Sequence, residues 1–186
     1  MDKKSIGIFV GSLRRDSMNK KIADYMAGLL EERFEVQIAD ISSLAMYNED
    51  LDNEADMPQE WRRFRQEVKA MDAVLFVTPE YNRSIPAVLK NALDVASRPR
   101  ADNVWRGKPG AVISAAHGNS GGFGANHHLR QVAVCLDIPM MAQPEAYIGG
   151  AAELIDENGL HDKYTKDQLK KFADKFADWI NGFSAD

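Results

Sequence analysis

The fold is decided by the stretch Ile6-Gly-Ile-Phe-Val10, a short apolar run that leads into the polar loop Gly11-Ser-Leu-Arg-Arg-Asp-Ser-Met-Asn19. Such runs, rich in β-branched residues, are typical of strands that are buried on both faces of a parallel sheet. Ala73-Val-Leu-Phe-Val77 repeats the pattern. Residues 36–38 and 111–113 supply two more strands, and the weaker pattern at residues 138–147 supplies a fifth. The sequence therefore predicts five strands.

Amphipathic helices are predicted between these strands. Apolar residues recur at three- and four-residue spacing within residues 22–30, 61–68, 88–95 and 129–136. A last helix is expected to begin at Thr165 and Gln168, which are placed as a capping box, and to run to Phe183. The alternation of strand and helix indicates right-handed crossovers and an open parallel sheet with helices on both faces. We expect residues 1–186 to form one α/β domain.

The composition excludes several classes of protein. The 186 residues are 45% hydrophobic and 27% charged, which is ordinary for a globular chain. With a net charge of −5, we expect neither a nucleic-acid partner nor attraction to an anionic membrane surface. No apolar stretch approaches the roughly 20 residues that cross a bilayer, and no signal peptide is recognisable. Because a single Cys135 cannot form an internal disulfide, the expected location is the cytoplasm.

Ligands of an open parallel sheet bind at the carboxyl ends of its strands. The loop after the first strand, residues 11–19, lacks both the dinucleotide fingerprint and the Gly-Lys-Ser/Thr ending of a P-loop. It offers instead two hydroxyls, an amide and a guanidinium at a helix start, where free backbone N–H groups favour an anion. These groups belong to Ser12, Arg14, Ser17 and Asn19. The cluster predicts a phosphate site, although Ser17 could equally be a structural helix cap.

Two further loops complete the predicted crevice. In residues 78–86, Glu80-Tyr-Asn82 suits a planar ligand with hydrogen-bonding edges, whereas Ser84 and Pro86 suit the start of a helix. The loop at residues 114–124 holds four glycines within seven residues. We interpret these glycines as a way to bring backbone N–H groups close to a bound group.

Together these motifs resemble the NAD(P)H-dependent FMN reductase family, and most closely its bacterial quinone and chromate reductases. The matching motifs are Gly11-Ser-Leu-Arg14 with Ser17 and Asn19, Pro79-Glu-Tyr-Asn82 with Ser84 and Pro86, Leu89-Lys-Asn91 with Asp94, and Gly107-Lys-Pro109. They follow the family order and spacing from Ser5 to about Gly150. Any one of them would be weak evidence, but the set is specific.

The resemblance implies a flavodoxin-like fold with sheet order 2-1-3-4-5, bound FMN, and NADPH or NADH as co-substrate. It also implies homodimers, which can pair into homotetramers. The implied cofactor residues are Ser12, Arg14, Ser17, Met18 and Asn19 around the phosphate, Pro79, Glu80, Tyr81, Asn82 and Arg83 along the flavin ring, and Ala116, His117 and Gly118, mainly through their backbone. Some close members have residues associated with contacts between dimers at the positions of Arg83, Gly124 and His127. The resemblance therefore leaves both the dimer and the tetramer as alternatives.

A flavin would carry the hydride itself, so we expect no catalytic acid or base from the protein. The expected acceptors are quinones, with free flavin, azo compounds and chromate as adventitious ones. A hydrolase that uses Ser12 is disfavoured, because the resembling lipase-like family needs a late Asp-x-x-His and His161 has Asn158 three residues before it. A non-enzymatic electron carrier or redox sensor remains an alternative, which steady NADPH oxidation with a quinone would decide.

The remaining polar groups suggest little further chemistry. His117, His127, His128 and Cys135 lack zinc spacing. The acidic residues from Asp50 alternate as in a calcium loop, but Ala55 stands at the glycine position and Trp61 at the glutamate position, so no metal is expected. Cys135, between Val134 and Leu136, is expected to be a buried and inert thiol. A basic group is either a solvated face or a clamp for NADPH phosphates or an anionic acceptor. Its members are Arg98, Arg100, Arg106 and Lys108.

Overall fold

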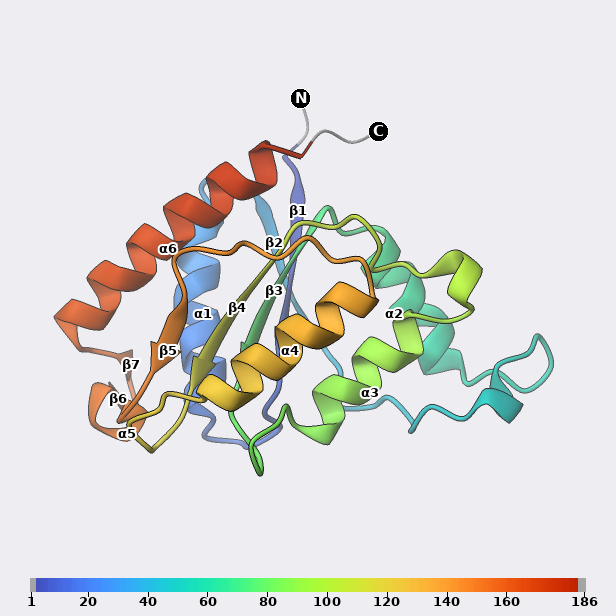
Figure 1. Ribbon diagram of the computed structural model, residues 1–186, viewed down its shortest axis with the longest axis horizontal. Coiled ribbons are helices and arrows are strands. Elements are labelled where there is room, and N and C mark those ends of the chain that lie inside the picture. The colour runs from blue at the N-terminus through green and yellow to red at the C-terminus, as the bar shows by residue number, and fades with distance from the viewer. Residues whose placement is uncertain (1–2, 184–186) are drawn as a thin grey trace.

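The central feature of the computed structural model, which describes residues 3–183, is a five-stranded parallel sheet (Figure 1). Its strands are β1 (Ser5–Val10), β2 (Glu35–Ala39), β3 (Ala73–Thr78), β4 (Gly110–Ala115) and β5 (Ala146–Ile148). They lie in the order β2-β1-β3-β4-β5, and each neighbouring pair is parallel. This is the order of the flavodoxin-like fold, and it confirms the predicted architecture.

Helices cover both faces of the sheet (Figure 1). The helix α1 (Met18–Leu30) and the last helix, α6 (Lys163–Asn181), pack on one face. The other face is covered by α2 (Gln59–Lys69), α3 (Ala87–Ala96) and α4 (Phe123–Cys135). Side chains of a strand alternate between these two cores, because successive residues of a strand point to opposite faces. In β1, for example, Ile8 packs toward α1 and Phe9 toward α2.

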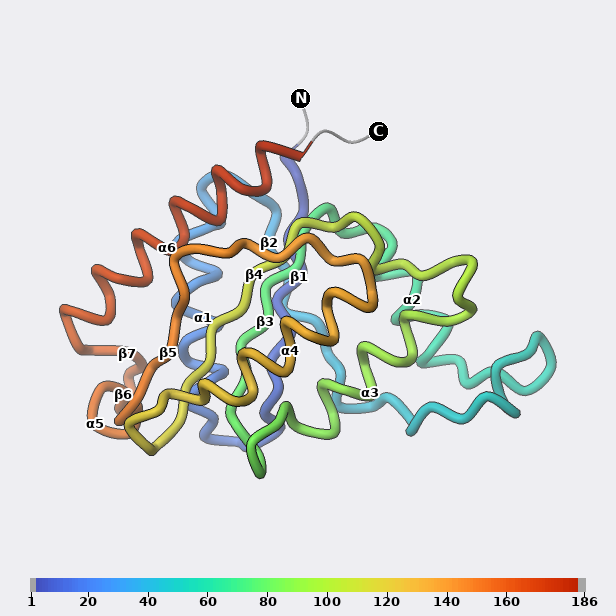
Figure 2. The backbone as a smooth tube through the Cα atoms, viewed as in Figure 1, coloured from blue at the N-terminus to red at the C-terminus, as the bar shows by residue number. Residues whose placement is uncertain are grey.

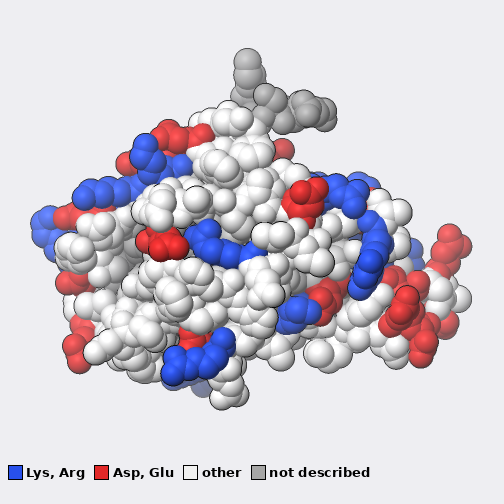
Figure 3. All heavy atoms as spheres, viewed as in Figure 1, with Lys and Arg blue, Asp and Glu red and all other residues white. Residues whose placement is uncertain are grey.

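A segment between β2 and α2 projects from one end of the molecule (Figure 1). It contains the 3-10 turn η1 (Glu49–Leu51), and Figure 3 shows acidic side chains gathered over it. The buried amide of Asn91 holds the base of the segment by accepting from the Tyr47 N–H at 2.8 Å and donating to the carbonyl of Ala45 at 3.0 Å. The remaining short elements are η2 (Arg100–Asp102), α5 (Ala151–Leu154), β6 (Ile155–Asp156) and β7 (Gly159–Leu160).

Three sequence expectations about element boundaries were wrong. The fifth strand spans only residues 146–148, because Pro139 and Pro144 remove backbone donors from the stretch before it. Asp162 rather than Thr165 caps α6, since its carboxylate accepts from the Thr165 N–H at 2.7 Å. Ser84 does not cap α3, because its hydroxyl lies 2.7 Å from His128 Nδ1 instead.

The start of β1 and the end of α6 lie side by side (Figure 2). They are joined by Lys4, whose ammonium donates to the carbonyls of Ile180 at 3.0 Å and Phe183 at 2.7 Å. Those carbonyls are at the helix C-terminus, where a cation is favourable. Within residues 3–183, no helix combines the length and apolar character needed to span a bilayer.

Candidate functional site

Three loops meet at the carboxyl edge of the sheet, beyond β1, β3 and β4, which are neighbours in the sheet. They enclose a pocket of about 280 Å³. Its lining consists of Ser12, Arg14, Ser17, Met18, Asn19, Pro79, Glu80, Tyr81, Ala115, Ala116, His117 and Gly118. The structure thus brings together every predicted cofactor residue except Asn82 and Arg83. It adds Ala115, which sequence reasoning missed and whose only signal is its place at the end of β4.

The first loop leaves one buried polar atom without a partner. Ser17 caps α1, because its hydroxyl accepts from the Lys20 N–H at 3.2 Å. The buried Asn19 donates through Nδ2 to the Ala115 carbonyl at 3.4 Å. Its Oδ1 has no hydrogen-bond partner among the described residues. An unpaired buried oxygen is costly, so this atom is suited to accept a hydrogen bond from a ligand hydroxyl.

The same end of the pocket favours an anion. It lies at the N-terminus of α1, whose first turn contains no acidic residue, so the helix dipole is not neutralised there. Arg14 adds an exposed guanidinium to the lining. The neighbouring Asp16 is turned to Lys21, which donates a hydrogen bond to it and lowers the pKa of the Asp16 carboxyl. A ligand that carries both a phosphate and hydroxyl groups fits this arrangement.

The second loop turns Asn82 and Arg83 away from the pocket. Tyr81 and Ser84 exchange backbone hydrogen bonds of 2.9 and 3.0 Å, which closes a two-residue hairpin turn. Asn82 and Arg83 form the tip of this turn with positive φ values of 51° and 69°. Hairpins of this kind need positive φ at both tip residues, because only then does the turn match the twist of its flanks. Pro79, Glu80 and Tyr81 are left to form this wall of the pocket.

The glycines of the third loop serve packing more than ligand approach, which corrects the interpretation from sequence. A Cβ on Gly121 would lie 2.6 Å from the Tyr147 carbonyl carbon, and one on Gly122 would lie 3.0 Å from Cβ of Ser114. Both residues also have positive φ. Gly118 alone of the four lines the pocket, and a Cβ there would meet open space. The bare backbone of this loop is therefore needed mainly because it packs against β4 and β5.

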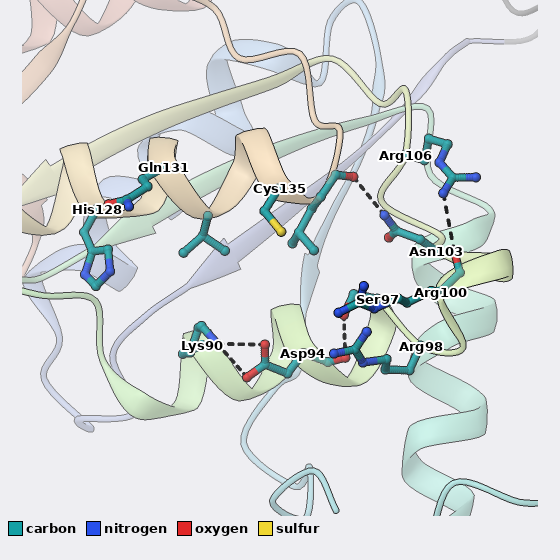
Figure 4. Close-up of a pocket in the computed structure, with 12 residues that line it drawn as sticks. Lys90, Asp94, Ser97, Arg98, Arg100, Asn103, Arg106, His128, Gln131 and Cys135 are labelled. Carbon is teal, nitrogen blue, oxygen red and sulfur yellow. Dashed lines mark hydrogen bonds and ion pairs between the residues drawn. The ribbon is translucent and has the colours of Figure 1, made fainter. Parts of the chain in front are cut away.

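A second pocket, of about 410 Å³, separates α3 from α4 (Figure 4). Arg98, Arg100 and Arg106 line it together, as the sequence grouping expected. Lys108 is elsewhere, because its ammonium donates to the carbonyls of Lys69 and Met71, and burial lowers the pKa of Lys108. This pocket adjoins the second loop, since His128 of its lining contacts Ser84.

Cys135 lines the same pocket and is exposed, so the expectation of a buried thiol was wrong. Its neighbours on α4 explain the error. The helix buries Leu129 and Ala133 against the sheet, and Cys135 lies on the opposite side with Val134, which is 79% exposed. An apolar residue type in an apolar run was therefore a poor guide to the buried face of this helix.

Comparison with known proteins places this geometry in a family. The model of the NADPH-dependent FMN reductase family matches residues 5–153. The chain belongs to this family. It is 51% identical over 176 residues to a quinone reductase of Pseudomonas putida, covering 95% of this chain and 94% of that protein. It is 47% identical over 176 residues to a 2-hydroxy-1,4-benzoquinone reductase of a Burkholderia species, covering 94% and 95%.

A solved structure agrees with these sequence matches. The flavoenzyme NAD(P)H:(acceptor) oxidoreductase FerB of Paracoccus denitrificans superposes with a TM-score of 0.89 at 40% identity, covering 96% of this chain and 98% of that one. Family membership makes FMN the cofactor of this reductase, with NADPH or NADH as the electron donor. The pocket fits FMN, because the ribityl hydroxyls are donors for the unpaired Asn19 Oδ1 and the phosphate suits the start of α1.

Proposed function

We propose that this protein is an NAD(P)H:quinone reductase that works through FMN bound at the carboxyl edge of the sheet. The observation that carries the proposal is the unpaired, buried Oδ1 of Asn19 beside the open N-terminus of α1, in a pocket whose other wall is Pro79-Glu-Tyr81. Relatives named as quinone reductases, about half identical over nearly the whole chain, support quinones as the acceptors.

Each wall of the pocket has a separate task in this proposal. Ser12, Arg14 and the N–H groups that begin α1 hold the phosphate, while Ser17 keeps the helix start in place. Asn19 accepts from a ribityl hydroxyl. Pro79 and Tyr81 lie along the ring on one side, and the backbone of residues 116–118 lies on the other.

FMN, when bound, accepts a hydride from the nicotinamide and passes it to the acceptor, so the protein supplies binding and orientation. The Ala116 N–H donates to the Ile148 carbonyl at 3.0 Å, so the backbone N–H groups of His117 and Gly118 are the ones that would stabilise negative charge on the ring. No side chain needs to act as an acid or base. Tyr81, which is 48% exposed, leaves one side of the site open to flat molecules that arrive in turn.

Several finer assignments belong to the same proposal. Free flavin, azo compounds and chromate are adventitious acceptors that would reach the same open side. One domain comprises residues 1–186, and the protein works in the cytoplasm as a homodimer. Exposed apolar side chains on α4, Phe123 and Val134, favour a contact between copies, and light scattering of the purified protein measures it.

The function is tested on the purified protein. We expect a yellow protein that releases FMN, identified by mass, and that oxidises NADPH steadily when benzoquinone is added. A protein that is colourless as purified and does not bind added FMN would contradict the proposal. An FMN-loaded protein that is reduced once by NADPH and does not turn over with quinone would instead be an electron carrier.

A further inference from the structure

Glu80 lines the pocket, yet its carboxylate is bound to a helix that begins beyond the opposite wall. Its Oε2 accepts a hydrogen bond from the backbone N–H of Ala125 at 3.1 Å. Ala125 is the third residue of α4. The Glu80 side chain is 12% exposed, and its other oxygen lies 3.6 Å from the Arg83 guanidinium, which is 86% exposed. Of the two contacts of this carboxylate, the one with α4 is therefore more buried than the one with Arg83.

The helix needs this contact from outside. Gly122 occupies the N-cap position of α4 and provides no side-chain cap. The Phe123 N–H donates to the carbonyl of Ser120 at 3.1 Å, so the N–H groups that follow, that of Ala125 included, are the ones that need a partner from outside the helix. No acidic residue lies in its first turn either. A carboxylate at this position satisfies one of the free donors and also interacts favourably with the helix dipole. Glu80 thus supplies, from the loop after β3, the cap that the sequence of α4 does not contain.

Gly124 makes room for the contact. A Cβ at this position would lie 2.9 Å from Oε2 of Glu80 and 3.1 Å from the carbonyl oxygen of Arg83. The second of these neighbours is backbone, so it cannot move without moving the loop. A glycine is therefore needed here because the loop after β3 passes directly over the first turn of α4. Its φ is not positive, so conformational freedom is not the reason.

The contact joins the two walls of the pocket. The pairing of β3 with β4 ends at Thr78 and Ser114, and the loops that line the pocket begin beyond that pair. One wall is Pro79-Glu-Tyr81, and the other is residues 116–118, which lead into α4. Across the gap, Glu80 binds α4 at Ala125, and the more exposed pair Ser84–His128 adds a second contact.

We propose that Glu80 is a positioning residue, which fixes the distance between the two walls by binding the first turn of α4, and that Gly124 is required for this contact. The inference rests on the proposed FMN site. In this account the carboxylate acts on the flavin through α4 and the loop before it. A glutamine at position 80 can keep the contact, because its amide oxygen is also an acceptor, whereas an alanine cannot.

The test measures FMN binding to apo-protein by fluorescence titration, together with the circular dichroism that the protein induces in the flavin bands. We expect Glu80→Ala to raise the dissociation constant about tenfold and to change the induced signal. Glu80→Gln should stay within about threefold of the wild type and keep its signal. Equal losses in the two variants would overturn the proposal, because glutamine keeps the acceptor oxygen for the Ala125 N–H, and this hydrogen bond would then not be what positions the walls.

Gly124→Ala provides an independent arm if Glu80→Ala does not fold. We expect it to weaken FMN binding as Glu80→Ala does, and to add less than about twofold when both changes are combined, since they break one contact. Gly28→Ala is the matched control, because Gly28 is exposed on α1 and a Cβ there meets nothing within 4 Å. Unchanged FMN affinity in Gly124→Ala, or additive losses in the double variant, would refute the positioning role.

These outcomes separate the inference from the function on which it rests. Wild-type protein that binds no FMN contradicts the proposed function before any variant is made. Wild-type protein that binds FMN, with Glu80→Ala and Gly124→Ala binding equally well, contradicts only the role of Glu80.

Discussion

Arg14 is suited to contact a phosphate, because its guanidinium is exposed and lines the pocket at the start of α1. Arg14→Ala should weaken FMN binding without affecting folding. Hydrogen bonds to charged groups contribute about 1.5–3 kcal/mol, which corresponds to roughly 10- to 150-fold in the dissociation constant. Titration of apo-protein with FMN measures the change. Arg15→Ala, an exposed neighbour outside the lining, is the control, and equal affinities for both variants would remove Arg14 from the site.

Cys135 lies in the pocket between α3 and α4, apart from the residues that line the proposed FMN site. In the proposed function the hydride passes through the flavin, so we expect the thiol to have no part in turnover. Cys135→Ser should therefore leave NADPH-dependent quinone reduction within about twofold of the wild type. Steady-state assays on FMN-loaded protein test this. A folded and loaded variant that has lost turnover would mean that the redox chemistry involves the thiol.

At the scale of elements, sequence patterns correctly predicted the strands and helices whose burial follows from their own residues. Strands such as residues 6–10 and 73–77 are buried on both faces, so their apolar runs are unambiguous, and the loops that follow them could be placed at one edge of the sheet. Sequence patterns did not predict the features that depend on contacts between segments far apart in the chain. The contact between Glu80 and Ala125, the packing of Gly121 against Tyr147, and the exposed side of α4 depend on neighbours that are remote in sequence.

Asn91 shows how one residue can hold an element that has little secondary structure. It is 4% exposed and binds three backbone groups of the segment between β2 and α2. Asn91→Ala leaves the Tyr47 N–H and the Leu44 carbonyl without this partner, while the Ala45 carbonyl keeps its hydrogen bond from Trp61 Nε1 at 2.9 Å. The cost is about 1–3 kcal/mol for each group that water cannot reach. We expect the free energy of unfolding to fall by about 2–4 kcal/mol in urea titrations. Asn181→Ala, at the exposed end of α6, should change it by less than about 0.5 kcal/mol.

At the scale of the whole molecule, a buried ion pair joins the segment between β2 and α2 to the helices of one face. Arg65 on α2 donates to both carboxylate oxygens of Asp52, at 2.8 and 3.0 Å, and to the carbonyl of Val95 on α3 at 2.8 Å. The side chains of Arg65 and Asp52 are 11% and 8% exposed. The pair therefore ties the projecting acidic segment to the two helices of one face. Removal of one member would leave a buried charge unpaired, which costs about 3–5 kcal/mol.

The same pair makes stability depend on pH. Hydrogen bonds from Arg65 hold the pKa of Asp52 below its usual value of 3.8. A carboxyl whose pKa is lowered by folding contributes stability that is present above its unfolded pKa and is lost as the pH falls through its folded pKa. Asp52→Asn should thus be less stable than the wild type at pH 7, and the difference should shrink below about pH 4. Urea unfolding of both proteins from pH 7 to pH 2.5 measures this, with the exposed Asp178→Asn as control. A difference that stays constant over the whole range would show that Asp52 contributes through packing and not through its charge.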